Sequence, residues 1–231
     1  MNPATLVAAG FWRRYAAWSL DAAPTLLLAG LLTRQQLQAM VATLATTAQA
    51  LVDRLAASML RAFEQGSGVP LAALTVALDP GLRDGSRALA TALARDLSWT
   101  ALVFAVLMLL QHVVFEQTRW RGTAGKRLLG LRVADLQGAA PSLARSLLRN
   151  LAGLLSWLSL NFGHALAAVP PQHRALHDYL AGTQVLAHAA PLPRWARAWL
   201  VVQALLLLLA FACAMNWMQG ALDAAFDRMM D

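Results

Sequence analysis

"LSWTALVFAVLMLLQHVVF", residues 97–115, contains no Lys, Arg, Asp or Glu. An α-helix rises ~1.5 Å per residue, so about 20 residues of this kind cross the ~30 Å hydrocarbon core of a bilayer. Residues 150–173 and 198–222 are also uncharged, and residues 15–33 are interrupted only by Asp21. The chain of 231 residues is 58% hydrophobic and 13% charged, whereas soluble domains have roughly 25% charged residues. The sequence therefore predicts a multi-pass membrane protein in contact with the lipid bilayer.

Basic residues are concentrated in the loop that follows this run. Residues 117–149 carry seven Lys or Arg against one acid, and Arg13 and Arg14 precede the first apolar segment. Short loops rich in Lys and Arg stay on the cytoplasmic side of a membrane. We therefore expect the cell inner membrane, with the N-terminus and this loop cytoplasmic and residues 34–96, which hold six arginines and five acids, outside. Because this loop holds most of the net charge of +7, the charge does not indicate nucleic-acid binding.

The apolar segment 150–173 is weaker than the others because polar and helix-breaking residues interrupt it. They are Asn150, Asn161, Gly163, His164, Pro170 and Pro171. Such a backbone is tolerated at membrane depth where protein or water covers it. Residues 174–197 carry three arginines against one aspartate, and the chain after residue 217 carries one arginine against three. This distribution favours a broken or re-entrant segment and an outside C-terminus. The alternative, a full crossing, would place residues 174–197 outside.

Residues 34–96 form a long connection between two predicted crossings. From Gln35 to Phe63 the apolar residues recur at intervals of three and four, which predicts an amphipathic helix of about seven or eight turns. Turn-forming residues end it at 66–70 and recur at 79–81, and a shorter helix is expected from Asp84. Two interpretations stay open. The insertion packs on itself or on the membrane surface, or it provides a surface for an oligomer or another membrane protein.

The segment "GTAGKRLLGLRVADLQG", residues 122–138, resembles a phosphate-binding loop at first sight. That loop requires a glycine five residues before Gly125 and a hydroxyl residue after the lysine. The chain has Trp120 and Arg127 at these positions, so no nucleotide site is predicted. The apolar residues 129–134 instead indicate a strand, and the only other strand-like stretch outside the apolar segments is 182–187. We expect the two to pair on the cytoplasmic side, because a lone strand is unstable.

Three blocks of sequence resemble the RDD family of membrane proteins. They are "GFWRRYAAWSLDAAPTLLL" (10–28), "GTAGKRLLGLRVADLQGAAPSLARSLLRN" (122–150) and "HRALHDYLAGTQVL" (173–186), and they occur in the family's order. The resemblance identifies Arg14, Asp21 and Asp178 as the arginine and two aspartates of the family name. The other motif positions are Gly122, Gly125, Lys126, Arg127, Gly138, Arg149, His177, Gly182 and Thr183. The insertion at 34–96 departs from the short turn expected in the family.

The three charges are predicted to form a cluster whose role has two interpretations. Arg14 and Asp21 lie two helical turns apart, about 10.5 Å, so they share a face without touching. An ionised aspartate inside the membrane costs ~2.5–3.5 kcal/mol, and Asp21 should therefore find a cation or take up a proton. Asp178 is expected where the chain returns to the cytoplasmic side, so it could approach Arg14. The cluster is either a proton- or cation-responsive site or an ion pair that fixes helix packing.

Other candidate sites are weaker. His173 and His177 share a helix face with metal-ligand spacing next to Asp178, but too few further ligands are evident, so no metal and no cofactor are predicted. His112 is interpreted as a helix-packing residue, and no serine has the setting of a nucleophile. The protein is therefore not expected to be an enzyme. Two functions remain: ion or small-solute transport or sensing, which the family resemblance also suggests and which implies a homo-oligomer, or a scaffold that binds a partner through residues 34–96.

The predicted fold is an all-α membrane protein in a single domain, residues 1–231, interrupted by the helical insertion at 34–96. It has about three full transmembrane helices and one broken or re-entrant segment. A two-stranded β element on the cytoplasmic side completes it.

Overall fold

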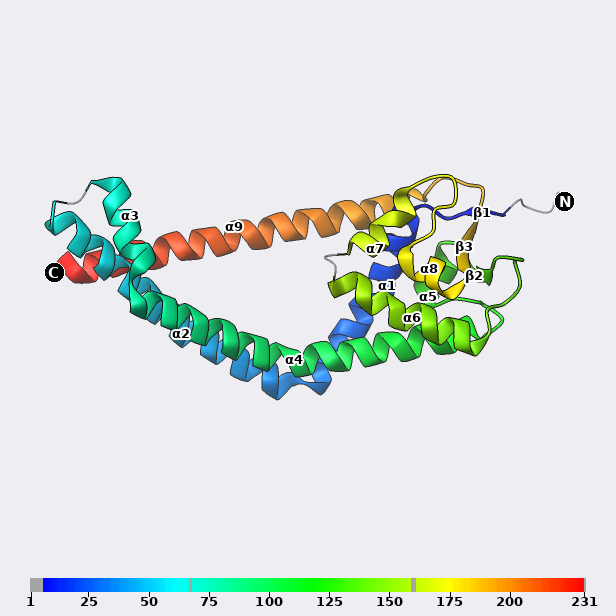
Figure 1. The fold of residues 1–231 in the computed structure, drawn as a ribbon, viewed down its shortest axis with the longest axis horizontal. Coiled ribbons are helices and arrows are strands. Elements are labelled where there is room, and N and C mark those ends of the chain that lie inside the picture. Colours follow the sequence, from blue (N-terminus) through cyan, green and yellow to red (C-terminus); the bar gives the residue numbers. More distant parts are fainter. Residues whose placement is uncertain (1–5, 67, 159–160, 231) are drawn as a thin grey trace. The chain divides into compact units, whose positions relative to one another are not determined.

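The computed structural model describes residues 6–66, 68–158 and 161–230. It is mostly helical, with one small antiparallel sheet (Figure 1). The helices are α1 (Phe11–Leu32), α2 (Arg34–Glu64), α3 (Val69–Leu78), α4 (Pro80–Glu116), α5 (Ala124–Leu128), α6 (Leu143–Leu158), α7 (Phe162–Ala165), α8 (Leu176–Ala181) and α9 (Arg194–Met230), with the 3-10 turn η1 (Leu166–Ala168). The strands are β1 (Leu6–Ala8), β2 (Leu131–Asp135) and β3 (Thr183–His188).

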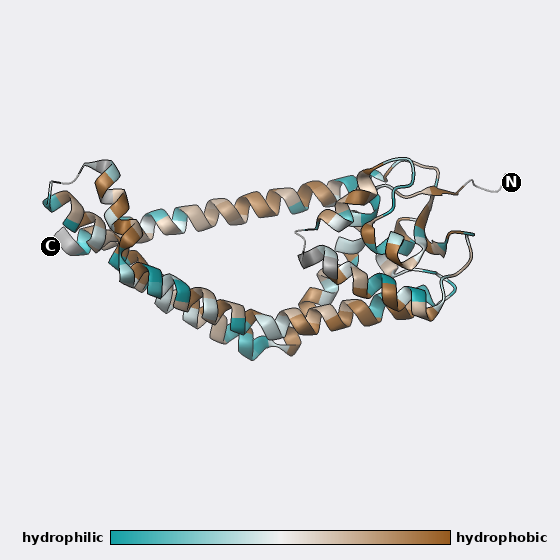
Figure 2. Cartoon of the chain, in the orientation of Figure 1, coloured by the Kyte–Doolittle hydropathy of each residue, from teal (hydrophilic) through white to brown (hydrophobic). Residues whose placement is uncertain are grey.

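Three of the described helices, α1, α4 and α9, are long and apolar enough to cross a bilayer. In α9 the five consecutive leucines 205–209 are each 58–70% exposed, and Figure 2 shows the apolar run along this helix. A surface of this kind is stable when lipid covers it. With 37 residues each, about 55 Å, α4 and α9 are longer than the ~30 Å hydrocarbon core. Their charged ends therefore extend beyond the apolar layer.

The segment that was predicted to be broken does not form a spanning helix. Helix α6 ends at Leu158 and α7 begins at Phe162, so the chain turns back after four helical turns. The buried face of α6 is polar or small, with Ser146, Arg149 and Ala152, whereas the leucines at 143, 147, 148, 151 and 154 are exposed. This inverted pattern fits a helix whose apolar face contacts lipid and whose polar face points into protein. The prediction of three full crossings and a broken segment is confirmed.

The chain divides into two compact units, and the first contains the sheet. It comprises residues up to Ala29 together with Val103–Val202. Strand β3 lies in the centre of the sheet and pairs with β2, which confirms the predicted pairing. The two strands are antiparallel, with Val133 opposite Val185. A third strand, β1, pairs with the other edge of β3, so the prediction of two strands was incomplete. The small face of α1 packs on the sheet through Ala16 and Ala17.

The second unit contains Gly30–Leu102 and the end of α9 from Gln203. The predicted amphipathic helix is present as α2, but the helix expected from Asp84 begins at Pro80 and continues into the apolar run without a break. Asp79 explains this start, because its carboxylate accepts the Leu82 N–H at 3.0 Å and caps α4. Helix α3 was not predicted.

The end of α9 packs on the insertion within this second unit. Ala225 forms a small apolar core with Val52 and Ala56 of α2, and Arg228 pairs with Asp53 at 2.5 Å. This contact places the C-terminal end of α9 and the insertion on the same side of any bilayer that the helices cross.

Candidate functional site

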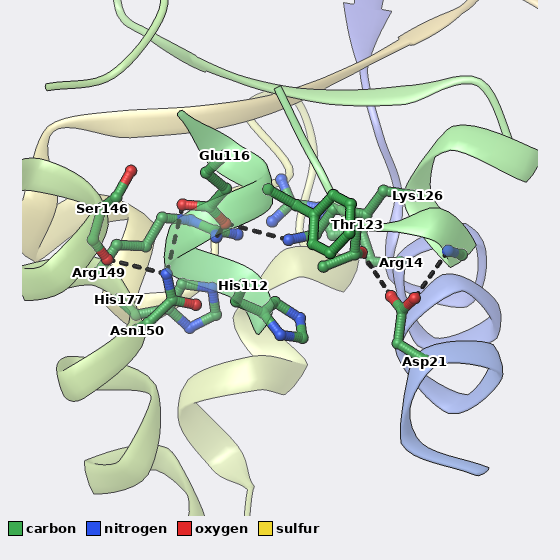
Figure 3. Close-up of polar contacts among 12 residues, drawn as sticks. Arg14, Asp21, His112, Glu116, Thr123, Lys126, Ser146, Arg149, Asn150 and His177 are labelled. Atoms are coloured by element: carbon green, nitrogen blue, oxygen red, sulfur yellow. Dashed lines mark hydrogen bonds and ion pairs between the residues drawn. The ribbon is translucent and has the colours of Figure 1, made fainter. Parts of the chain in front are cut away.

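Asp21, inside α1, is bound by the loop that begins the second family block. Thr123 donates its hydroxyl to Asp21 Oδ2 at 2.5 Å, and the Gly125 N–H donates to Oδ1 at 2.7 Å (Figure 3). The Asp21 side chain is buried, with 2% exposure. We expected Asp21 to find a cation or a proton. Instead its nearest partners in the described structure are a hydroxyl and a backbone amide, which compensate much of the cost of burial.

Gly125 can reach Asp21 because it has no side chain. A Cβ at this position would lie 2.2 Å from the Ala17 carbonyl oxygen and 3.0 Å from Asp21 Oδ2. Any other residue would push the loop away from α1. The glycine of the Gly-Lys pair therefore serves close packing of backbone on backbone, and the Lys126 that follows it points to a different carboxylate.

Glu116, at the end of α4, is the centre of a second polar cluster and is fully buried. It accepts hydrogen bonds from Lys126 at 3.1 Å, from Arg149 at 2.5 Å and from the Asn150 amide at 3.3 Å. Figure 3 shows the Arg149 and Lys126 side chains reaching this carboxylate from α6 and α5. Two elements, α5 and α6, are thus tied to the end of one candidate spanning helix.

Arg149 connects this cluster to Asp178, the second family aspartate. Its Nε donates to Asp178 Oδ1 at 3.0 Å, and Arg14 of α1 forms an ion pair with the other oxygen. The same oxygen accepts the Ala175 N–H at 3.0 Å at the start of α8. Arg14 is further fixed by the carbonyl of His173, at 2.5 Å. The charge network is defined here as Lys126, Glu116, Arg149, Asp178 and Arg14.

The electrostatics of the groups outside the spanning helices follow from this burial. Burial alone would raise the pKa of Asp178, but Arg14 and Arg149 hold it well below its usual range, so Asp178 is ionised. Burial lowers the pKa of Lys126, and the Glu116 carboxylate opposes that shift. Burial lowers the pKa of His177 to about 3, so this histidine is neutral. The charge network thus places two acidic side chains, Glu116 and Asp178, among three basic ones, Arg14, Lys126 and Arg149.

The remaining motif residues have local roles. Gly182 (φ +61°) ends α8 and Gly138 (φ +85°) lies in the turn after β2, conformations that favour glycine. Gly122 packs against Lys126, because a Cβ added at Gly122 would lie 3.1 Å from that side chain. Arg127 is exposed and lies over the Trp120 ring, 5.9 Å from its centroid. Thr183 begins β3 and is buried. No group of three or more potential metal ligands occurs among the described residues.

The structure brings together some of the predicted charges and separates others. Arg14 and Asp178 are paired, while Asp21 lies in its own hydrogen-bonded site. Lys126 and Arg149 were known only as motif positions, and sequence reasoning missed Glu116 altogether. One signal was available: Glu116 directly ends the uncharged run 97–115 and faces a loop of seven basic residues.

These features define a class of protein: a multi-pass membrane protein in which ion pairs tie the ends of the candidate spanning helices α1 and α4 to the short helices α5, α6 and α8. The chain belongs to the RDD family, whose sequence profile matches residues 8–182. It is similar to two proteins of Bacillus subtilis (strain 168), the uncharacterized proteins YxaI and YckC. YxaI is 30% identical over 87 residues, which is 38% of this chain and 57% of YxaI. YckC is 35% identical over 89 residues, 36% of this chain and 59% of YckC.

The chain thus spans less than two thirds of either relative. No solved structure matches it significantly.

Proposed function

We propose that this RDD protein transports or senses a small ion or solute through the charge network and Asp21, with no enzymatic step. The observation that carries the proposal is the concentration of five buried charged side chains and the partly buried Arg14, from α1, α4, α5, α6 and α8, within one unit. Burying charges is expensive, and in membrane proteins ionisable groups at such positions commonly mark ion or substrate pathways. The basic loop 117–149 supports an orientation with the network on the cytoplasmic side of the inner membrane.

Flux measurements test this proposal. The full chain is reconstituted in proteoliposomes with a pH- or cation-sensitive dye inside, and Asp21→Asn is compared with wild type. We expect the exchange to abolish pH- or cation-dependent flux while the protein stays folded, because the amide keeps the size of the side chain and removes its charge. Asp53→Asn is the matched control, since Asp53 is 48% exposed and pairs at the surface with Arg228. Equal flux in wild type and Asp21→Asn contradicts transport through these charges.

A second function, a membrane scaffold, is favoured by the insertion. Helix α3 carries no charged residue and exposes Leu71, Leu74 and Leu78 by 52–57%. Exposed apolar side chains in a row on a short helix are suited to a partner protein. Deletion of residues 36–94 distinguishes the two functions. Under the scaffold function the deletion loses the partner in a pull-down from mild detergent, and Asp21→Asn only lowers abundance. Under transport the deletion leaves flux intact.

A further inference from the structure

A cavity of about 520 Å³ lies within the first unit, next to the charge network. Its apolar walls come from three helices that are at least partly in lipid. The residues that form these apolar walls are Phe11 and Trp18 of α1, Ala105, Met108 and Leu109 of α4, and Leu154 of α6. Ligand cavities typically measure roughly 300–1,000 Å³, so this cavity has the size of a small-molecule site.

The polar part of the same cavity is lined by cations and hydrogen-bonding groups. They comprise the three cations Arg14, Lys126 and Arg149, the three histidines His112, His164 and His177, and two asparagines. Among the described residues that line the cavity, none is acidic. The carboxylates of Glu116 and Asp178 are 0% exposed and neutralise the cations without facing the cavity.

Two of these cations keep hydrogen-bonding capacity. Among the described contacts, the Lys126 ammonium donates to Glu116 alone, and an ammonium has three N–H groups. Arg149 uses Nε and Nη1 for the two carboxylates, which leaves Nη2. Both side chains are buried, with 7% and 5% exposure. Donors of this kind recognise a carboxylate or a phosphate.

The cavity extends from these donors into the depth of the membrane. From His112 to Ala105 the lining of α4 runs for seven residues, about 10 Å along the helix. Ala105 and Met108 belong to the uncharged run 97–115, which is long enough to lie in the hydrocarbon core. A ligand that fills the cavity therefore has its polar end at Lys126 and Arg149 and an apolar part alongside α4.

From these observations we infer that the cavity binds an amphiphile with one anionic head group, a carboxylate or a phosphate, and one alkyl chain taken from the bilayer. The head group accepts hydrogen bonds from Lys126 and Arg149, and the chain lies against α1, α4 and α6. The inference rests on the proposed function because it assigns a ligand to the same site. Because binding is measured independently of flux, amphiphile binding and the proposed transport function can be rejected separately.

The experiment uses the full chain in phosphatidylcholine nanodiscs with a 16-carbon carboxylic acid that carries a photoreactive group on its chain. Competitors are the unlabelled acid, an alkyl phosphate, the alcohol of equal length, and acetate or inorganic phosphate. We expect crosslinking to α1, α4 or α6, competition by the acid and the alkyl phosphate, and at least tenfold weaker competition by the alcohol and the short anions.

Two variants locate the site. Gly153 lines the cavity and a Cβ there meets no atom within 4 Å, so Gly153→Phe adds a bulky side chain at the cavity wall without a clash at its Cβ. Gly220→Phe is the control, because Gly220 also has open space around its Cβ but lies in the second unit. Gly153→Phe should reduce crosslinking at least tenfold and Gly220→Phe should not. Lys126→Gln, checked for folding by its elution in gel filtration, should lose the preference for the acid over the alcohol.

Three results would overturn the inference. Equal competition by the alcohol means that the cavity takes lipid chains regardless of charge. Equal competition by acetate or phosphate means a site for free anions. Crosslinking unchanged in Gly153→Phe places the amphiphile elsewhere. If the amphiphile binds as expected but no flux is detected, the transport proposal is rejected and the inferred binding site stands.

Discussion

Arg149 is the residue on which the charge network depends, and replacing it with methionine tests the network directly. Arg149 is 5% exposed and bonds Glu116 of α4 and Asp178 of α8, at 2.5 and 3.0 Å. Methionine keeps an unbranched apolar chain and removes the charge, so both carboxylates lose one buried partner. Breaking a buried ion pair from one side costs about 3–5 kcal/mol, because the remaining charge is uncompensated.

The assay is thermal unfolding in detergent, followed by the fluorescence of the eight tryptophans. For a chain of this size about 1 kcal/mol corresponds to roughly 2–4 °C, so Arg149→Met should lower the Tm by about 6–20 °C. Arg145→Met is the control on the same helix: its side chain is 47% exposed and pairs with Asp135 at 3.6 Å. Such a surface pair is worth at most about 1 kcal/mol.

A double-mutant cycle with Glu116→Gln assigns the loss to the pair. The two changes should be less than additive, since each removes the same interaction. A Tm decrease for Arg149→Met no larger than that for Arg145→Met would refute the reasoning. It would show that the ion pairs contribute little to stability.

Three further predictions concern single positions. Gly125→Ala should lower the free energy of unfolding by about 1–3 kcal/mol through overpacking against α1. Gly220→Ala is the control and should not lower it, because a Cβ at Gly220 meets open space. Chemical denaturation in detergent measures both variants. Asp178→Asn should destabilise the protein equally at pH 7 and pH 5. The pKa of Asp178 is depressed, so the stabilisation by its carboxylate is lost only as the pH falls below about 4. A Tm difference between wild type and variant that shrinks from pH 7 to pH 5 contradicts this prediction. His177 is held neutral with a pKa of about 3, so as the pH falls the unfolded state binds a proton on this histidine before the folded state does. The stability of the protein therefore falls as the pH drops below about 6.5. His177→Gln should reduce the dependence of the Tm on pH between pH 6.5 and 4, and an unchanged slope contradicts this prediction.

The sequence by itself determined the membrane class and which segments are long and apolar enough to cross a bilayer. The uncharged run 97–115 and the polar interruptions of 150–173 are local properties, and hydropathy and helix breaking act on neighbouring residues. The pairing of β2 with β3 also followed from the sequence, because few segments outside the apolar runs could form strands. These features need no knowledge of distant contacts.

The tertiary structure decided which groups the buried charges meet. Asp21 bonds Thr123 and Gly125, which are 102 and 104 positions away, and Arg14 bonds Asp178 across 164 positions. Glu116 became a centre of ion pairs only where α5 and α6 approach the end of α4. A charge at the end of an apolar run can face water, lipid head groups or protein, and only packing selects among them. Hydropathy thus placed the helices. Buried charges require partners, and because those partners lie far along the chain, the ion pairs join the ends of the helices to distant elements.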